Sequence, residues 1–236
     1  MNPQLPLILK LKDSATFDSY FAGGNNEIIT YLRRWTENPQ SPNIYLWGEP
    51  GTGKSHLLQA VCHAAGARNV AAVYLAMQTA DQIPCEALHG LENVGTVCID
   101  DISLIAGRID WETALFRLLD RIFETNGGLV VTGNALPTQL GLQSAQLLSR
   151  LAGCLPLQLR PLEPIEKLQA LQQRAARRGL TLTTEAGRYL VRHYGRNTNI
   201  LFAALEILDQ ASMAAQRKIT IPFMRATLSQ TSFLSE

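Results

Sequence analysis

The sequence GEPGTGKS, residues Gly48–Ser55, fits the pattern G-x-x-x-x-G-K-[ST] at every required position. A short apolar, β-prone run over residues 43–47 precedes it, and a run typical of a helix, residues 56–61, comes after it. The motif therefore lies between a predicted strand and a predicted helix, which is the context that a phosphate-binding loop requires. A glycine-rich turn that fits the pattern by chance is the weaker alternative.

The residue types in this loop suit the binding of a nucleoside di- or triphosphate. Glycines let the backbone fold tightly and turn its N–H groups toward a phosphate. The following helix adds the positive end of its dipole. Lys54 is expected to bridge the outer phosphates and the Ser55 hydroxyl to bind Mg²⁺, so ADP or ATP with Mg²⁺ is predicted. The expected nucleotide-binding residues are Gly48, Glu49, Pro50, Gly51, Thr52, Gly53, Lys54, Ser55 and His56.

Two later strand ends carry polar residues that suit the same chemistry. Residues 95–101 are β-formers that end in Asp100 and Asp101, the pattern of a buried parallel strand with carboxylates at its C-terminal edge. We expect Asp100 to hold Mg²⁺ through water and Asp101 to orient the attacking water, although a capping Asp is the alternative. Asn134 ends the next predicted strand, residues 129–134, and is either a contact to the water or γ-phosphate or a simple turn residue.

The other elements of this part of the chain are a mixture of helices and strands. A helix is predicted over residues 27–35 with Asn26 as its N-cap, and another over residues 110–123. A further strand is predicted over residues 71–75. The sequence therefore predicts an α/β domain with a parallel sheet.

A composition break at residues 161–164, between two prolines, marks the predicted domain boundary. The chain beyond this boundary is predicted to form a small all-α bundle. Its helices are expected over residues 164–178, 184–194, 199–217 and 220–228. The expected domain limits are 1–12 for an N-terminal peptide, 13–162 for the nucleotide-binding domain and 163–236 for the helical domain.

Composition narrows the class of protein. The chain has 236 residues, of which 46% are apolar and 17% charged, and its net charge is +1. That is ordinary for a soluble protein and excludes the overall basic excess of a DNA-coating protein. The four cysteines have no zinc-binding spacing, and Cys62 and Cys98 lie in apolar runs that predict buried thiols. Neither a signal peptide nor a membrane span is predicted, and a cytoplasmic location is expected.

Over nearly its whole length the chain resembles the AAA+ ATPases, and within them the DnaA-related group. The residues that carry the resemblance are 16–18, 54–58, 99–102, 106–107 and 149–151. The resemblance implies a P-loop AAA+ parallel-sheet domain followed by a small all-α lid bundle. Neither the initiator's N-terminal assembly domain nor its C-terminal helix-turn-helix domain is expected in this chain. That layout, with residues 215–223, is similar to the Hda group of DnaA regulatory inactivators.

The resemblance to the inactivators implies an activity and partners. The implied activity is to promote hydrolysis of DnaA-bound ATP on the DNA-loaded sliding clamp, which is a negative control of initiation. Arg150 lies at the family's arginine-finger position and would act in trans on the nucleotide of DnaA, although it is also consistent with a plain surface arginine. Gln4, Leu5 and Leu7 resemble the peptide that binds the clamp, the beta subunit of DNA polymerase III; an edge strand is the alternative.

Further expectations arise where this chain departs from the family. Members of the inactivator group often lose the loop lysine, but Lys54 is present, which favours nucleotide binding. Asn199 stands where the family has a sensor arginine, and Arg196 is offset, so weak intrinsic ATPase activity is expected. A homo-oligomer is possible, and neither sequence-specific DNA binding nor membrane binding is expected. A DnaA-like helicase loader or stand-alone ATPase is the alternative function, and a small-molecule kinase is the weakest interpretation.

Overall fold

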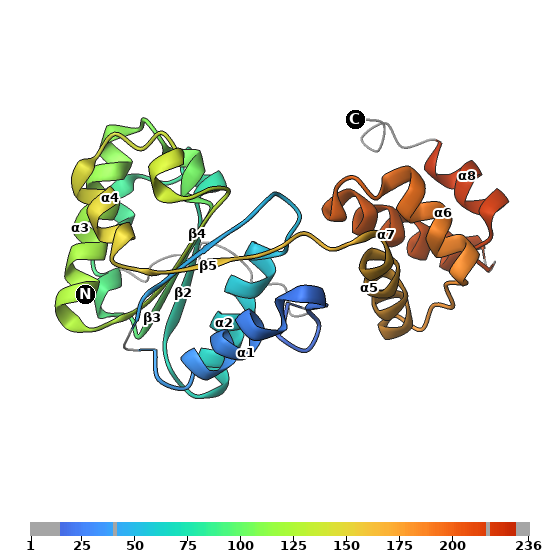
Figure 1. The fold of residues 1–236 in the computed structure, drawn as a ribbon, viewed down its shortest axis with the longest axis horizontal. Helices are drawn as coiled ribbons and strands as arrows, with labels where there is room; N and C mark the ends of the chain where they lie inside the picture. Colours follow the sequence, from blue (N-terminus) through green and yellow to red (C-terminus); the bar gives the residue numbers. More distant parts are fainter. Residues whose placement is uncertain (1–14, 40–41, 216–217, 230–236) are drawn as a thin grey trace. The chain divides into compact units, whose positions relative to one another are not determined.

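The computed structural model describes residues 15–39, 42–215 and 218–229 (Figure 1). The chain divides into two compact units: the first ends at Arg160 and the second begins at Pro161, and the loop residues 50–52 group with the second. The predicted N-terminal peptide, residues 1–12, lies outside the described residues.

A five-stranded parallel sheet in the order β2-β3-β4-β1-β5 forms the centre of the first unit. Its strands are β1 (Ile44–Trp47), β2 (Ala72–Ala76), β3 (Thr96–Asp100), β4 (Gly128–Gly133) and β5 (Leu155–Gln158). The central strands β3 and β4 are buried along their whole length, as expected for a parallel sheet that is covered on both faces. The predicted α/β fold with a parallel sheet is confirmed.

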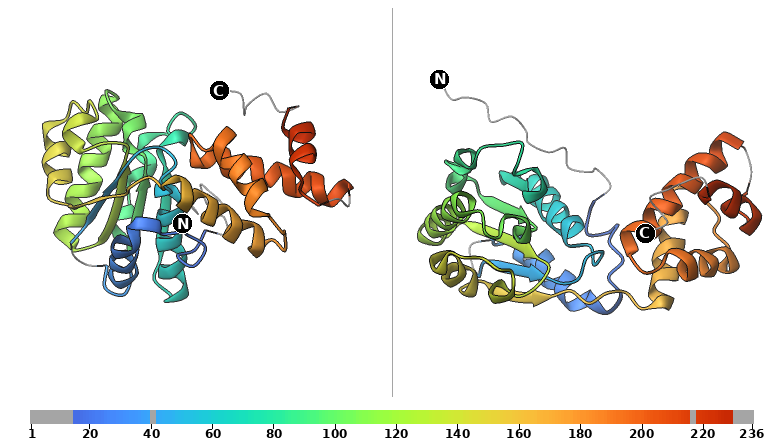
Figure 2. Two further views of the ribbon diagram at one scale, coloured as in Figure 1. Left: turned by 45° about the vertical axis from the view of Figure 1, so that its right-hand side comes forward. Right: turned by 90° about the horizontal axis from the view of Figure 1, so that it is seen from above.

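Helices cover both faces of this sheet, as Figures 1 and 2 show. The helices are α1 (Asn26–Trp35), α2 (Lys54–Ala67), α3 (Ile109–Thr125) and α4 (Ala145–Ala152). Side chains alternate between the faces along each strand, so Val97 and Ile99 join the core beneath α3 and α4, whereas Cys98 joins the core beneath α1 and α2. The sheet therefore separates two apolar cores.

The second unit is a four-helix bundle over the described residues, as predicted (Figure 2). Its helices are α5 (Pro164–Arg177), α6 (Thr184–Tyr194), α7 (Thr198–Ala215) and α8 (Ile221–Leu228). They enclose a separate core that includes the fully buried Leu171, Leu190 and Leu205. The hydroxyls of Thr183 and Thr220 accept backbone N–H bonds at the starts of α6 and α8, which satisfies amides that a helix leaves unpaired.

The strand β5 has no counterpart among the predicted elements. It contains Pro156, which cannot donate a backbone hydrogen bond, and only alternate residues are half-buried. The strand lies at the edge of the sheet, where only one side is paired. The N–H group of Leu155 donates to the carbonyl of Asn43, just before β1, and that of Leu159, just after β5, donates to the carbonyl of Trp47. An edge position tolerates proline because the nitrogen of Pro156 faces away from the sheet.

The predicted N-cap at Asn26 is wrong. The helix α1 follows directly on a short 3₁₀ turn, η1 (Gly23–Asn25), and Asn26 is already its first residue. The Asn26 amide donates back to the carbonyl of Gly23, at 2.9 Å. The side chain of the buried Asn25 instead exchanges two hydrogen bonds with the backbone of Arg160, which ties the start of α1 to the segment after β5.

Two other expectations concern burial. The thiols of Cys62 and Cys98 are buried, as predicted, within the core beneath α1 and α2. Among the residues that the structure describes, no helix combines the length and the apolar character needed to cross a membrane.

Candidate functional site

The candidate site lies where the carboxyl ends of β1, β4 and β3 meet at one edge of the sheet. Parallel pairing places Trp47 of β1 beside Gly133 of β4, and Ile99 of β3 beside Val131 of β4. The loop that follows Trp47 therefore lies along the same edge as the ends of the two neighbouring strands. Ligands of open α/β sheets bind outside this edge.

The loop Gly48–Ser55, here called the P-loop, has a backbone that only glycine accommodates well. Gly51 and Gly53 have φ angles of 85° and 88°, in the left-handed region. A Cβ atom on Gly53 would also lie 2.5 Å from Cε2 of Tyr20. Helix α2 begins immediately afterwards at Lys54, so its first N–H groups point into the loop.

Lys54 is held inside this loop. The residue is 8% exposed, and its Nζ donates to the carbonyl oxygens of Gly48 and Glu49, at 2.6 and 3.1 Å. Burial lowers the pKa of Lys54, and the negative charges of Asp101 and Asp100 oppose that shift. The ammonium group thus shares one electrostatic environment with both predicted carboxylates.

Asp100, at the end of β3, is held by two hydroxyl groups from the neighbouring strands. Tyr74 of β2 donates to its Oδ2 at 2.6 Å, and Thr132 of β4 donates to its Oδ1 at 2.8 Å. Asp100 is 4% exposed, and the burial of Tyr74 together with the negative charge of Asp100 raises the pKa of Tyr74. These two partners were not predicted, because each lies in a run that was interpreted only as a strand.

Asp101 lies one residue further on, in a strained backbone position. Its φ angle is 57°, which an aspartate adopts far less readily than a glycine. Its backbone N–H donates to the hydroxyl oxygen of Thr132 at 2.8 Å. Among the described residues, its buried Oδ1 has no hydrogen-bond partner. Such an orphaned acceptor suits a site that takes a water molecule or a donor of a ligand.

The remaining predicted residues of this edge differ in what they contact. Ser55 is exposed in the first turn of α2, and Asn134 is exposed just after β4, where its N–H donates to the hydroxyl of Ser103. The His56 imidazole lies 3.0 Å from the hydroxyl of Ser19 and 2.9 Å from the carbonyl of Thr16. It therefore ties the segment before α1 to α2, and its predicted nucleotide contact stays a prediction.

Arg150 is not part of this cluster. It lies in the last turn of α4, shortly before β5, which begins at Leu155 beside Ile44, the first residue of β1. Arg150 is thus near the amino ends of the strands, whereas the P-loop lies at their carboxyl ends. Its guanidinium forms an ion pair with Asp120 of α3 and lies 5.7 Å from the ring centroid of Phe123, and its side chain is 42% exposed.

Comparison with known families explains both units. The family described as the bacterial DnaA ATPase domain matches residues 11–158, more than half of the chain. The chain belongs to the DnaA-related AAA+ family. A second family, described as the lid domain of Hda, matches residues 165–228, so this DnaA-related AAA+ protein has a lid of the Hda type.

Solved structures show the same architecture. Domain III of the Thermotoga maritima replication initiation protein DnaA superposes with a TM-score of 0.82 at 17% identity, covering 97% of this chain and 100% of that one. AMPPCP-bound DnaA from Aquifex aeolicus gives 0.70 at 20% identity, covering 84% of this chain and 66% of that one. The Thermotoga maritima RuvB branch migration motor gives 0.64 at 15%, with coverages of 88% and 69%. Identities this low show the fold alone.

The position of Thr132 leads to a prediction about stability. Thr132→Val keeps the shape of the side chain but removes the donor to Asp100 and the acceptor of the Asp101 N–H group, in a fully buried position. We expect the free energy of unfolding, measured by urea denaturation, to fall by about 1–3 kcal/mol, the cost of leaving buried polar groups unpaired.

Two variants act as controls for that measurement. Thr132→Ser keeps the hydroxyl and should lose less stability than Thr132→Val. Thr96→Val changes another buried threonine of the sheet, whose hydroxyl has no hydrogen-bond partner among the described residues, and should be close to neutral. Equal losses for Thr132→Val and Thr96→Val would contradict a role for this hydrogen-bond network.

Proposed function

We propose that this protein is a nucleotide-binding regulator of replication initiation that, together with the DNA-loaded sliding clamp, promotes hydrolysis of ATP bound to DnaA. The observation that carries the proposal is the separation of two features in one α/β unit. The P-loop lies at the carboxyl ends of the parallel strands, and Arg150 lies near their amino ends. An arginine in that place is unsuited to the chain's own nucleotide and suited to one on a neighbouring protein.

Binding of ADP or ATP is supported by the geometry of the P-loop. The N–H groups at the start of α2 and the glycine backbone form a concave donor surface for phosphate. The Lys54 ammonium would exchange its bonds to the Gly48 and Glu49 carbonyls for bonds to phosphate oxygens. Relatives of the same fold, among them DnaA from Aquifex aeolicus, are bound to the ATP analogue AMPPCP.

The residues present also fit Mg²⁺ that arrives with the nucleotide. Ser55 and Asp100 supply oxygen atoms of the kind that Mg²⁺ takes, and the hydroxyls of Tyr74 and Thr132 fix the orientation of Asp100. Within the described part of the chain, no group of three or more His, Cys, Asp or Glu side chains could hold a metal by itself. The ion would therefore need phosphate oxygens, and it would neutralise charge on them.

The chain's own ATP hydrolysis is expected to be weak. Asp101 and Asn134 lie at the carboxyl ends of the strands, where a water molecule would be oriented. Arg150, the proposed finger, lies near the amino ends of the strands. In the lid, Asn199 is exposed in the first turn of α7, where the family resemblance places a sensor arginine. We infer that bound nucleotide acts mainly to hold the chain in the conformation that meets its partners.

The proposed partners are DnaA and the sliding clamp, the beta subunit of DNA polymerase III, in the cytoplasm. The Hda-type lid supports the assignment to the inactivators rather than to a helicase loader. Gln4, Leu5 and Leu7, which lie outside the described residues, are proposed to bind the clamp through their resemblance to its peptide ligands. Self-association, direct sequence-specific DNA binding and membrane binding are not needed for this activity.

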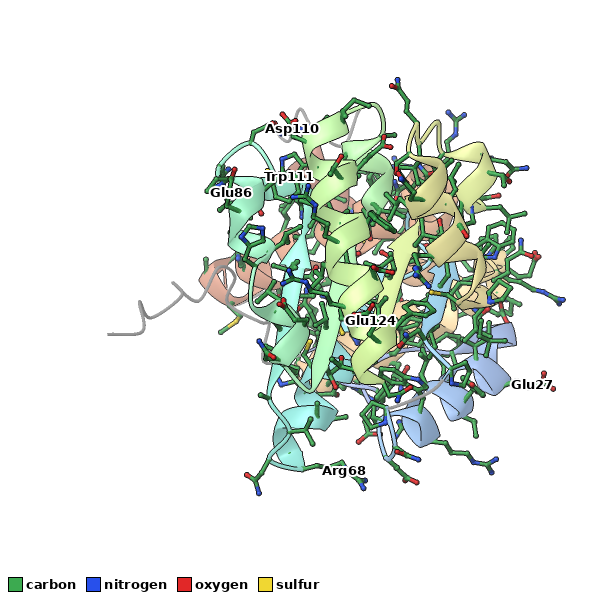
Figure 3. The ribbon with its side chains drawn as sticks, turned by 90° about the vertical axis from the view of Figure 1, so that its left-hand side faces the viewer. Glu27, Arg68, Glu86, Asp110, Trp111 and Glu124 are labelled. Atoms are coloured by element: carbon green, nitrogen blue, oxygen red, sulfur yellow. The ribbon has the colours of Figure 1, made fainter. Side chains whose placement is uncertain are left out.

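A first prediction concerns nucleotide binding. Lys54→Ala removes a charge-assisted hydrogen bond worth about 1.5–3 kcal/mol, so the affinity for ADP should fall roughly ten- to hundredfold in an equilibrium titration. The matched control is Arg68→Ala, which removes an exposed cation beyond the other end of α2 (Figure 3). Unchanged affinity in the Lys54 variant would show that the P-loop does not bind nucleotide.

A second prediction tests the function itself. Hydrolysis of DnaA-bound ATP, measured with clamp-loaded DNA, should be accelerated by the wild-type protein and not by Arg150→Ala, since an arginine finger contributes about 10³–10⁵ in rate. Arg117→Ala, which removes an exposed cation of α3, should behave as wild type. A wild-type protein that leaves DnaA unaffected but binds the replicative helicase would favour the loader.

A third prediction concerns the clamp. Changing Gln4, Leu5 and Leu7 to Ala should abolish binding of the full chain to the isolated clamp in a pull-down or titration. Nucleotide affinity should remain, because the P-loop lies elsewhere in the sequence. Lys12→Ala, in the same segment, is the control. Retained clamp binding in the triple variant would remove the N-terminal peptide from the proposal.

A further inference from the structure

The helix that carries Arg150 is anchored to α3 by a buried carboxylate. Glu112 in the first turn of α3 is 0% exposed, and its Oε2 accepts the N–H groups of Gln143 and Ser144 at 2.8 and 2.6 Å. Its Oε1 accepts the N–H group of Gly107 at 2.7 Å. Ser144 is itself the N-cap of α4. The start of α4 is therefore fixed against α3. Figure 3 shows the face of the sheet that α3 and α4 cover.

The end of α4 meets the same helix through Arg150. One guanidinium nitrogen forms an ion pair with Oδ1 of Asp120, and the group lies 5.7 Å from the ring centroid of Phe123. The side chains of Arg150 and Asp120 are 42% and 29% exposed, so both reach solvent, although the paired Oδ1 atom of Asp120 is itself buried. A guanidinium has five N–H donors, so this arrangement leaves donors for another acceptor.

We propose that Asp120 is a positioning residue, which orients the guanidinium of Arg150 toward the nucleotide of a partner protein. This inference rests on the proposed function of Arg150 as a finger acting in trans. A long arginine side chain at the surface samples many rotamers and must lose that freedom when it meets a phosphate. A carboxylate and an aromatic ring on a rigid neighbouring helix remove part of that freedom before the partner arrives.

The same contact is unsuited to a restraining role. Because both side chains are partly exposed, solvent screens the ion pair in part, and both side chains lose entropy in forming it, so its net free energy is modest. A polyphosphate offers the guanidinium far more negative charge and bidentate geometry. Asp120 therefore orients Arg150 without preventing its contact with phosphate. Replacing Asp120 should weaken the effect of Arg150 on hydrolysis and should not increase it.

The test compares Asp120→Asn with wild type in the hydrolysis of DnaA-bound ATP on clamp-loaded DNA. We expect the maximal rate at saturating protein to fall about tenfold, since misplaced catalytic groups lose rate, and the half-saturating concentration to stay unchanged. Asp120→Glu, which keeps the charge, should recover part of the rate. The control is Glu92→Gln, which removes the ion pair of the adjacent Arg121 and should have no effect.

A second measurement does not depend on DnaA. The Nε–H group of Arg150 should show a higher NMR order parameter than that of the exposed Arg117 on α3, and Asp120→Asn should lower it to the Arg117 level. Equal mobility of the two arginines in the wild-type protein would overturn the inference, as would a maximal rate that Asp120→Asn leaves unchanged or raises. Failure of wild type to stimulate DnaA would instead contradict the proposed function, with the order parameters still deciding the role of Asp120.

Discussion

The parallel pairing of β1, β4 and β3 is the constraint on which the rest of the structure depends. It brings the P-loop, Thr132 and the carboxylates of Asp100 and Asp101 to one edge of the sheet, although they are far apart in the sequence. The hydroxyl of Thr132, on β4, then links that strand to the end of β3, because it donates to Asp100 and accepts from the Asp101 N–H group. Asp100 and Thr132 are buried, so these hydrogen bonds are stronger than they would be in water.

The same sheet also separates two kinds of chemistry. Because parallel strands all run in one direction, the segments that follow them gather at the carboxyl ends of the strands. The segments that precede them gather at the amino ends. The P-loop follows β1, whereas Arg150 precedes β5. One unit can thus present a phosphate-binding loop and, near the opposite edge, a cation held by Asp120 and Phe123.

Features encoded in short continuous stretches were predicted from the sequence. The strand, loop and helix around Lys54 follow one another without interruption, so the glycine spacing and the flanking apolar runs were enough to locate them. The edge strand β5 was missed, because its Pro156 and half-exposed residues lack the apolar pattern of a buried strand. Asn26 was misplaced as a cap because the 3₁₀ turn that ends at Asn25 leads directly into α1, so Asn26 already has helical backbone angles.

By itself, the sequence determined the type of fold, the P-loop and the acidic end of β3, because local propensity and motif spacing specify them. Only the tertiary structure decided which groups surround those residues: that Tyr74 and Thr132 hold Asp100, that Glu112 joins α3 to α4, and that Asp120 pairs with Arg150. These partners come from different strands and helices. Their side chains meet only after packing of the sheet and helices has fixed the register between elements, which no local pattern in the chain records.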